Sequence, residues 1–254
     1  MVTVSSLWVG GSLSDLEINC IKSHLKVGHN FILYVYENID NIPNGVLIKD
    51  GREILNERHL GLGDKYGFYP FSDIFRFNLM YKKGGYWVDL DLYATRSWDS
   101  LEDKEFIFAS ERTIQKGAYR NRTKDKVATI CMLKAPPKSV FYYDLCSKVD
   151  NPKFKINRRD ACMIEIRKLI EKYNLEKHVV DFYLFCGVDW WNAKEMFLNT
   201  ELKDKYGVEA MSKEEVLDRS FGLHFWRHLI VNKFGKYGLT NNFEEKSLYN
   251  YFLN

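Results

Sequence analysis

The hydrophobic positions of this chain follow two different periods along its first half. Short segments rich in apolar residues predict strands over Val2–Val9 and Phe31–Tyr36, and a short third strand over Val46–Ile48. Between the first two strands, Ser14 and Glu17 have the spacing of a capping box, which indicates the start of a helix. Strands that alternate with helices in this way are typical of an α/β protein with a mostly parallel sheet.

The period changes within one segment, Ser72–Tyr93. Up to Lys83 the apolar residues recur at helical spacing, and Ser72 as N-cap with Asp73 in the first turn favours a helix that begins there. Gly84 and Gly85 end the helix, and the period then becomes two. The pattern predicts a strand with Val88, Leu90 and Leu92 on one face and with Trp87, Asp89, Asp91 and Tyr93 on the other.

The second half of the chain has a weaker pattern. Glu111–Lys126 is polar and without clear period, which favours an exposed loop that could touch an acceptor or simply be solvated. No repeat or linker divides the chain, so we expect one domain over residues 1–254. The remaining predicted elements are strands over Phe106–Ser110, Val127–Lys134 and Val179–Phe185, and helices over Val140–Lys148, Asn157–Lys172 and Met211–Asp218.

The pair Asp89 and Asp91 is the strongest chemical signal in the sequence. Asp is disfavoured in strands, and two carboxylates this close repel each other unless a cation lies between them. An oxygen-seeking ion such as Mn²⁺ or Mg²⁺ that also binds a phosphate would meet that need. The alternative is an exposed edge strand with two solvated Asp side chains.

The segment around this pair carries a longer pattern. Ser72-Asp73-Ile74-Phe75-Arg76, followed by Tyr81-Lys82-Lys83-Gly84-Gly85-Tyr86-Trp87-Val88-Asp89-Leu90-Asp91, resembles the signature of the DXD-containing, sugar-binding-region glycosyltransferases. That group includes capsular and lipopolysaccharide transferases, initiating mannosyltransferases and the glucosylating domains of clostridial toxins. One departure is Trp87, where the group more often has Tyr.

The resemblance implies a fold and a reaction. The fold would be of the GT-A type, a Rossmann-like, mostly parallel sheet flanked by helices, in which residues 1–100 bind the nucleotide-sugar and residues 101–254 bind the acceptor. The enzyme would be a hexosyltransferase that moves a sugar to a hydroxyl of a glycan acceptor, with retention of configuration. The donor would be a UDP-hexose or UDP-N-acetylhexosamine, although GDP-mannose is also used in the group.

The resemblance also assigns roles to particular residues. Asp89 and Asp91 would hold Mn²⁺ or Mg²⁺, with His224 as the third ligand and His228 as an alternative to it. Arg76 would face the donor phosphate. The remaining donor-site residues would be Trp8, Val9 and Gly10 at the base, Asp73 at a hydroxyl of the donor, and Trp226 beside His224.

Each of these assignments has a structural alternative. Trp8 could be a core residue, and Asp73 and Arg76, three positions apart on a helix, could form a local ion pair. Trp190 and Trp191 could form a sugar platform or simply pack. The Gly-Pro stretch that the group often carries near the acceptor has no counterpart here, which leaves Asp160 as a weak candidate at that position.

Composition narrows the class of protein further. A net charge of +3 gives no argument for nucleic acid as a partner. The five Cys residues, which are scattered and lack a C-x-x-C pair, fit free thiols better than a disulfide scaffold or a zinc site. With neither a signal sequence nor an apolar run that could span a membrane, we expect a cytoplasmic protein, with possible peripheral membrane contact through the basic and aromatic stretch Asn232–Asn254.

Two other functions compete with the glycosyltransferase. A haloacid-dehalogenase phosphatase also has D-x-D after a strand, but it needs Thr or Val after the second Asp, where this chain has Leu92. A non-catalytic relative that binds a nucleotide-sugar or a glycan would not need Asp73, Arg76, Asp89 and Asp91 together. The sequence therefore favours a metal-dependent glycosyltransferase of polysaccharide or glycoconjugate synthesis, and it predicts neither the acceptor nor the oligomeric state.

Overall fold

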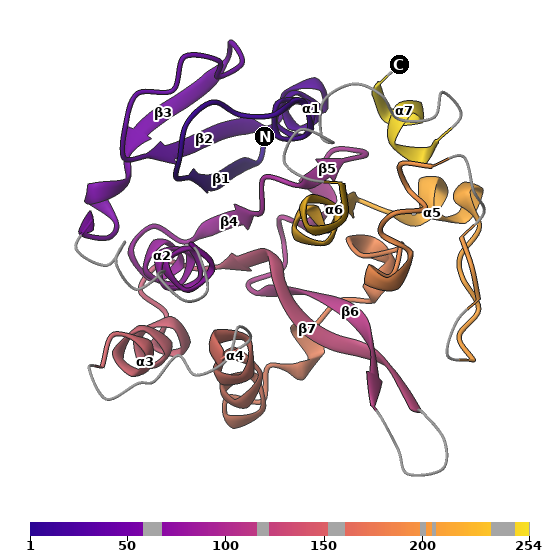
Figure 1. Cartoon of the computed structure of the whole chain (residues 1–254). Helices are drawn as coiled ribbons and strands as arrows, with labels where there is room; N and C mark the ends of the chain where they lie inside the picture. Colours follow the sequence, from indigo (N-terminus) through magenta and orange to yellow (C-terminus); the bar gives the residue numbers. More distant parts are fainter. Residues whose placement is uncertain are drawn as a thin grey trace.

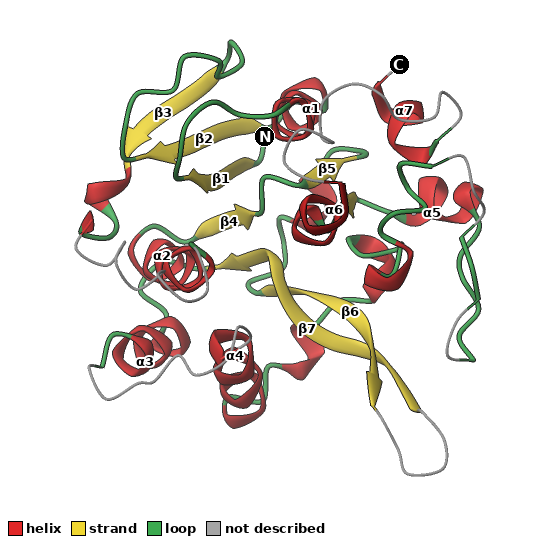
Figure 2. Cartoon of the chain, in the orientation of Figure 1, coloured by secondary structure: helices red, strands yellow, loops and turns green. Residues whose placement is uncertain are grey.

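A six-stranded mixed sheet forms the centre of the protein (Figures 1 and 2). The computed structural model describes residues 1–57, 68–115, 122–151, 161–198, 202–204, 207–234 and 247–253. The strand order is β3-β2-β1-β4-β7-β6. The strands span Thr3–Trp8 (β1), Asn30–Val35 (β2), Val46–Asp50 (β3), Gly85–Val88 (β4), Ile107–Gln115 (β6) and Arg122–Ala135 (β7).

The sheet is parallel over one part and antiparallel over the other. β3, β2, β1 and β4 run in the same direction, whereas β7 is antiparallel to both β4 and β6. The carboxyl ends of the parallel strands therefore meet at one edge, where ligands bind in open α/β sheets. The predicted fold class, a mostly parallel α/β sheet flanked by helices, is confirmed.

Helices and a second, small sheet cover the two faces. One face carries α2 (Tyr69–Lys82), α3 (Val140–Val149) and α4 (Ala161–Lys172). The other carries α1 (Asp15–Lys26), the pair β5 (Leu92–Ala94) and β8 (Gly222–His224), and α5 (Lys213–Arg219), α6 (Arg227–Phe234) and α7 (Leu248–Leu253). Short 3₁₀ turns span Gly51–Glu53, Asp99–Leu101, Glu176–His178, Phe182–Leu184 and Trp190–Asn192.

The alternation of side chains along the strands separates two hydrophobic cores. The register pairs Val4 with Tyr86 and Ser5 with Trp87. Tyr86 packs in the core beneath α1, and Trp87 packs in the core beneath α2. Both are almost fully buried, and a large side chain buried in this way contributes about 1.5–3 kcal/mol.

The central helix differs from its prediction at the N-terminus. α2 begins at Tyr69, after Phe68 as N-cap, and carries Pro70 in its first turn. Proline suits that turn because its missing N–H would have no partner there. Ser72 is therefore not the N-cap, and Asp73 lies past the first turn, where it is buried beside Arg76.

The predicted strand over the aspartate pair is interrupted. β4 ends at Val88, and the chain turns before β5 begins at Leu92, whose N–H donates to the Asp89 carbonyl at 3.0 Å. Asp89 and Asp91 are thus on a turn between the two sheets and not on one face of a strand. Aspartate favours turns over strands, which accounts for the difference.

Four other predictions need correction or fall partly outside the described residues. The described parts of Glu111–Lys126 are not a loop but arms of the long β6–β7 hairpin, which extends from the body of the protein (Figure 2). Val179–Phe185 is not a strand: it contains a 3₁₀ turn and a single bridge from Val179 to Phe108. The first residues of the predicted helix Asn157–Lys172, with Asp160 among them, and much of Asn232–Asn254 lie outside the described residues.

The capped helices follow their predictions closely. Ser14 and Glu17 form the capping box at the start of α1, and the helices over Val140–Lys148 and Met211–Asp218 are present as α3 and α5. In the described part of the chain, no helix combines the length and the hydropathy needed to cross a membrane.

Candidate active site

A cleft of about 750 Å³ opens at the carboxyl edge of β1 and β4. This volume is in the range of small-molecule sites, about 300–1,000 Å³. Every residue that the sequence singled out for the donor site lines it: Trp8, Val9, Gly10, Asp73, Arg76, Asp89, Asp91, His224 and Trp226, as does the alternative His228. Segments from both ends of the chain therefore meet in one cavity.

Asp89 is held in place by three contacts. Its Oδ1 accepts hydrogen bonds from Arg76 at 2.7 Å and from the indole N–H of Trp87 at 2.9 Å, and its backbone N–H donates to the Cys131 carbonyl at 2.8 Å. Burial raises the pKa of Asp89, against the lowering effect of Arg76, and the nearby Asp91 raises it further. Trp87, the departure from the family pattern, thus supplies a hydrogen bond to the first aspartate.

Arg76 lies beside this carboxylate in the wall of the cleft, and little of its side chain is exposed. It is buried, and all five N–H donors of its guanidinium have protein partners. These are Asp89 and the Ile130 carbonyl on NH1, the Ser72 hydroxyl and Asp73 on NH2, and the Ser72 carbonyl on Nε. In this arrangement Arg76 has no spare N–H donor for the predicted contact with a phosphate. Its guanidinium instead holds the Asp89 carboxylate in place.

Asp91 lies at the N-terminus of α6. Its Oδ2 accepts from the backbone N–H of Arg227 at 2.6 Å, and its Oδ1 is 3.3 Å from Nε2 of His224. Although burial alone would raise it, the pKa of Asp91 lies below its usual value because of His224 and the Arg227 N–H. The two aspartates, close together in the chain, are thus held in opposite electrostatic environments.

His224 completes a cluster with the two aspartates. It ends β8, where it pairs with Leu92 of β5, and its ring lies 4.2 Å from that of Trp226. Burial opposes its charge, but the carboxylate of Asp91 raises the pKa of His224 well above the ordinary value. One ligand atom each from Asp89, Asp91 and His224 lie within 4.8 Å of one another, a spacing that could hold a metal ion.

The wall of the cleft also contains Trp8, Val9 and Gly10, the segment that we expected to bind the base. The Trp8 indole N–H donates to the Gly11 carbonyl at 2.6 Å, and the Arg227 guanidinium lies over the Trp8 ring at 5.4 Å. Gly10 has φ of 128°, a conformation that favours glycine. Trp8 is half-buried, so its ring is neither a core residue nor fully solvated.

Trp226 takes an unusual backbone conformation for an aromatic residue, with φ of 55°. It is buried, and its indole N–H donates to the Val188 carbonyl at 2.9 Å. This turn places Trp226 in the wall of the cleft and starts α6 directly after it. Trp190 and Trp191 pack against each other at 5.3 Å and are not among the residues that line the cleft.

Two charged residues of the cleft were given no role by the sequence analysis. Glu111 lines the cleft from β6, with 12% of its side chain exposed, and is 3.4 Å from Arg167; burial raises its pKa. Arg227 lines the cleft from the start of α6 and pairs through Nε with the buried Glu17. The polar composition of Glu111–Lys126 hid the strand, and a single Arg after two aromatic residues gave little signal.

Comparison with known proteins supports part of this account. Residues 64–147 match the family model of the capsular polysaccharide synthesis proteins, which is roughly a third of the chain and includes the aspartate pair. No curated protein sequence matches the chain significantly.

Two solved structures are also similar. The PaToxG glycosyltransferase has 14% identity and a TM-score of 0.45, with 67% of this chain and 69% of that chain covered. The UDP-bound glycosyltransferase domain of the YGT toxin has 10% identity and a TM-score of 0.39, with 98% and 81% covered. The family match shows that this chain is similar, over the segment that carries Asp89 and Asp91, to capsular polysaccharide synthesis proteins, and it confirms the predicted resemblance to glycosyltransferases of polysaccharide synthesis.

Proposed function

We propose that this protein is a metal-dependent glycosyltransferase that transfers a hexose or N-acetylhexosamine from a nucleotide diphosphate, most simply UDP, to a hydroxyl of a glycan. The observation that carries the proposal is the cluster of Asp89, Asp91 and His224 in the wall of a cleft of about 750 Å³. The cluster could hold a metal ion beside the diphosphate of a donor, and the cleft is large enough to take the base and the sugar as well.

The residues of the cluster fit a divalent cation. Two carboxylates and one imidazole suit Mn²⁺, and carboxylates with water suit Mg²⁺. Asp89 and Asp91 would be the primary ligands, and His224 would join through Nε2, the nitrogen that faces Asp91. When bound, the ion neutralises charge that develops on the leaving diphosphate.

We assign the second positive charge at the diphosphate to Arg227 in place of Arg76. Among the described residues, the Arg227 guanidinium pairs with Glu17 through Nε alone, and it lies beside the Trp8 ring in the cleft wall. NH1 and NH2 are thus able to form the paired hydrogen bonds with which arginine binds phosphate oxygens. Arg76 keeps a role in the reaction only through Asp89.

The two ends of the donor have separate candidate contacts. Trp8 would pack on the base, and the backbone of Val9 and Gly10 would hydrogen-bond to its edge. Asp73 would accept a hydrogen bond from a hydroxyl of the donor. Glu111, on β6, is a mostly buried carboxylate in the same cleft. We propose that it accepts a hydrogen bond from a hydroxyl of the transferred sugar or of the acceptor.

The reaction course that the resemblance implies retains the anomeric configuration. In that case an oxygen of the leaving diphosphate can take the proton of the acceptor hydroxyl, and no protein base is needed. An inverting course would need a carboxylate base at the acceptor, and Glu111 is the candidate that the cleft offers. The anomeric form of the product distinguishes the two.

The proposal is tested by a panel of UDP- and GDP-sugars with and without Mn²⁺. At a donor concentration about a hundred times Kd, binding stabilises the fold by about 2.7 kcal/mol. For a chain of this size that corresponds to a rise in Tm of roughly 5–10 °C. We expect one donor to give this rise only with metal and to be hydrolysed slowly.

Two other outcomes would contradict the proposal. Binding of a nucleotide-sugar with no turnover, even with glycan acceptors, would show a non-catalytic binding protein. If no nucleotide-sugar raises Tm under any metal condition, then the cleft does not bind this class of ligand.

A further inference from the structure

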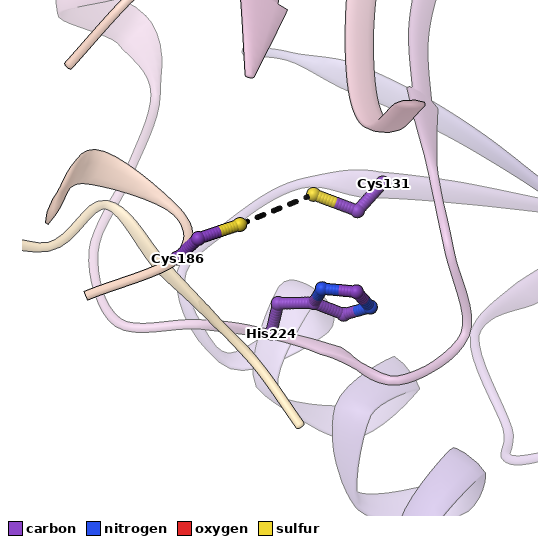
Figure 3. A group of neighbouring side chains, drawn as sticks. All are labelled: Cys131, Cys186 and His224. Carbon is purple, nitrogen blue, oxygen red and sulfur yellow. Dashed lines mark hydrogen bonds between the residues drawn. The ribbon is translucent and has the colours of Figure 1, made fainter. Parts of the chain in front are cut away.

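A second group of potential metal ligands adjoins the aspartate cluster. Cys131 of β7, Cys186 after the turn Phe182–Leu184, and His224 of β8 place one sulfur or nitrogen atom each within 4.8 Å of one another. Figure 3 shows the two sulfur atoms on one side of the His224 ring. All three residues are buried.

The two sulfur atoms have the separation of thiolates on one tetrahedral ion. Sγ of Cys131 and Sγ of Cys186 are 3.7 Å apart, and both cysteines are free. Two thiolates bonded to zinc at about 2.3 Å with a tetrahedral angle lie about 3.8 Å from each other. The protein backbone therefore already holds the sulfur atoms at the spacing that the ion requires.

The imidazole presents a nitrogen to this group. Nδ1 of His224 is buried and has no hydrogen-bond partner among the described residues, and in Figure 3 one ring nitrogen points to the side of the sulfur atoms. The other nitrogen, Nε2, is 3.3 Å from Asp91. A histidine that binds a metal through one nitrogen commonly donates its second N–H to a carboxylate, which fixes the ring.

We propose that Cys131, Cys186 and His224 form a binding site for Zn²⁺ or another thiolate-seeking divalent ion, which adjoins the oxygen-rich site at Asp89 and Asp91 and shares His224 with it. Cys131 and His224 both line the cleft, so an ion can enter from there and its fourth position can be taken by water. Sulfur and imidazole ligands select zinc, whereas carboxylates select Mn²⁺ or Mg²⁺. The two sites thus differ in the ion that they prefer.

The two sites share one residue and so exclude each other in part. With zinc on Nδ1, a neutral His224 carries its proton on Nε2 and donates it to Asp91. That nitrogen is then unable to bind an ion at Asp89 and Asp91. Zinc is therefore expected to weaken the binding of Mn²⁺. The site would thus allow zinc to inhibit the proposed transfer reaction, which is a regulatory role beyond the reaction itself.

The site is tested with Co²⁺, because cobalt in a tetrahedral thiolate site gives a sulfur-to-metal charge-transfer band and intense visible bands. The full chain, freed of metal and reduced with a phosphine, is titrated with Co²⁺ and then with Zn²⁺. We expect one Co²⁺ per chain with a charge-transfer band that Zn²⁺ removes. Cys131→Ser and Cys186→Ser should each lower the affinity at least about tenfold, since even the loss of an outer partner costs that much.

Cys146→Ser is the matched control. Cys146 is another buried free cysteine, on α3, and its change should leave the bands unaltered. Circular dichroism verifies that each variant is folded, and Cys186→Ala replaces Cys186→Ser if the latter is not. Absence of the charge-transfer band in the folded wild type, or an equal band in the Cys131 and Cys186 variants, would overturn the proposal.

A second measurement connects the site to the cleft. In the wild type, Zn²⁺ should lower the affinity for Mn²⁺, measured by electron paramagnetic resonance of free Mn²⁺. In Cys186→Ala this effect of Zn²⁺ should be lost while Mn²⁺ binding itself is retained. The Co²⁺ spectra do not depend on any transferase activity, so failure of the transfer proposal would leave this test intact.

Discussion

The guanidinium of Arg76 donates to the Asp89 carboxylate across 2.7 Å, and the arginine side chain is buried whereas 25% of the aspartate side chain is exposed. A buried arginine whose donors are all taken cannot also bind a phosphate without breaking one of these bonds. The contact makes Arg76 a positioning residue that fixes one oxygen of Asp89 beside the proposed metal position.

Substitution of Arg76 is expected to affect the fold and the metal together. Arg76→Met removes the positive charge that pairs with Asp89 and Asp73, and loss of one member of a buried ion pair costs about 3–5 kcal/mol of unfolding free energy. Arg76→Lys keeps the charge but loses the fork, so it should bind Mn²⁺ more weakly while remaining folded. Urea unfolding and Mn²⁺ titration measure the two effects.

Arg52→Met is the control, because Arg52 forms exposed pairs with Asp50 and Glu57. Such pairs contribute at most about 1 kcal/mol. If Arg76→Lys bound Mn²⁺ normally and lost only its affinity for UDP, then Arg76 would be a phosphate ligand after all.

Arg227 is expected to contribute much of the binding affinity for UDP through contacts with the diphosphate. Arg227→Lys keeps a cation beside Glu17 but removes the paired donors, so UDP should bind roughly 10- to 100-fold more weakly, as expected for lost hydrogen bonds to a charged group. Titration calorimetry with UDP and Mn²⁺ measures this. The control Arg219→Lys changes an exposed arginine of α5 that packs on Tyr183, and it should have no effect. Equal UDP affinity in Arg227→Lys would remove Arg227 from the donor site.

Glu111 is expected to act on the sugar and not on the nucleotide. Glu111→Gln keeps the shape of the side chain but loses its charge, so kcat for transfer or hydrolysis should fall by at least about tenfold, since a hydrogen bond to a charged group contributes about 1.5–3 kcal/mol. UDP affinity should be unchanged. Glu105→Gln, at an exposed position before β6, is the matched control. A variant with normal kcat and weakened UDP binding would place Glu111 at the wrong end of the donor.

The sequence predicted the site better than the elements that build it. Segments with caps, such as α1 with Ser14 and Glu17, were located correctly because their start depends on a few neighbouring residues. Most of the candidate residues that line the cleft were singled out because the motif around Asp89 and Asp91 is long, although Glu111 and Arg227 were given no role. The turn at these aspartates was missed, since Leu90 and Leu92 continue an alternating pattern even though β5 joins a different sheet.

The remaining differences come from tertiary contacts that no local pattern contains. One N–H donor of Arg76 is taken by the Ile130 carbonyl, which lies on β7 and is distant in the chain. The sulfur pair Cys131 and Cys186 joins two segments without any recognisable spacing. Glu111 was assigned to a loop because the segment Glu111–Lys126 is rich in polar residues and has no clear period.

The buried pair His24 and His29 is expected to make the fold sensitive to acid. Their Nδ1 atoms are 3.0 Å apart, so one is the donor and the other the acceptor, and protonation of both would break the contact. Burial lowers the pKa of His24 to about 3 and that of His29 to about 4. The unfolded chain, with an ordinary histidine pKa near 6.5, therefore binds protons that the folded chain does not.

The sign of the effect follows from these directions. The free energy of unfolding should be highest above about pH 6.5, where neither state protonates these histidines. It should then fall as the pH drops toward 4, by up to about 1.4 kcal/mol per pH unit for His24. Urea unfolding between pH 7.5 and 5 measures this slope. His24→Gln should reduce the slope, whereas His178→Gln, at a partly exposed histidine, should not. An equal slope in His24→Gln would refute the assignment.

We propose that the aspartate pair holds a metal that transfer requires, and the rate at which Asp91→Asn hydrolyses a UDP-sugar is the sharpest test of this role. The substitution keeps the acceptor atom for the Arg227 N–H but removes the charge that would bind the ion and that attracts His224. Asp103→Asn, the same change at an exposed position, is the control. We expect Mn²⁺-dependent hydrolysis by the wild type and by Asp103→Asn, with a loss of about a hundredfold or more in Asp91→Asn, comparable to removal of a charge-stabilising group. Hydrolysis by Asp91→Asn at the wild-type rate, or a wild-type rate that is the same without any divalent ion, would contradict it.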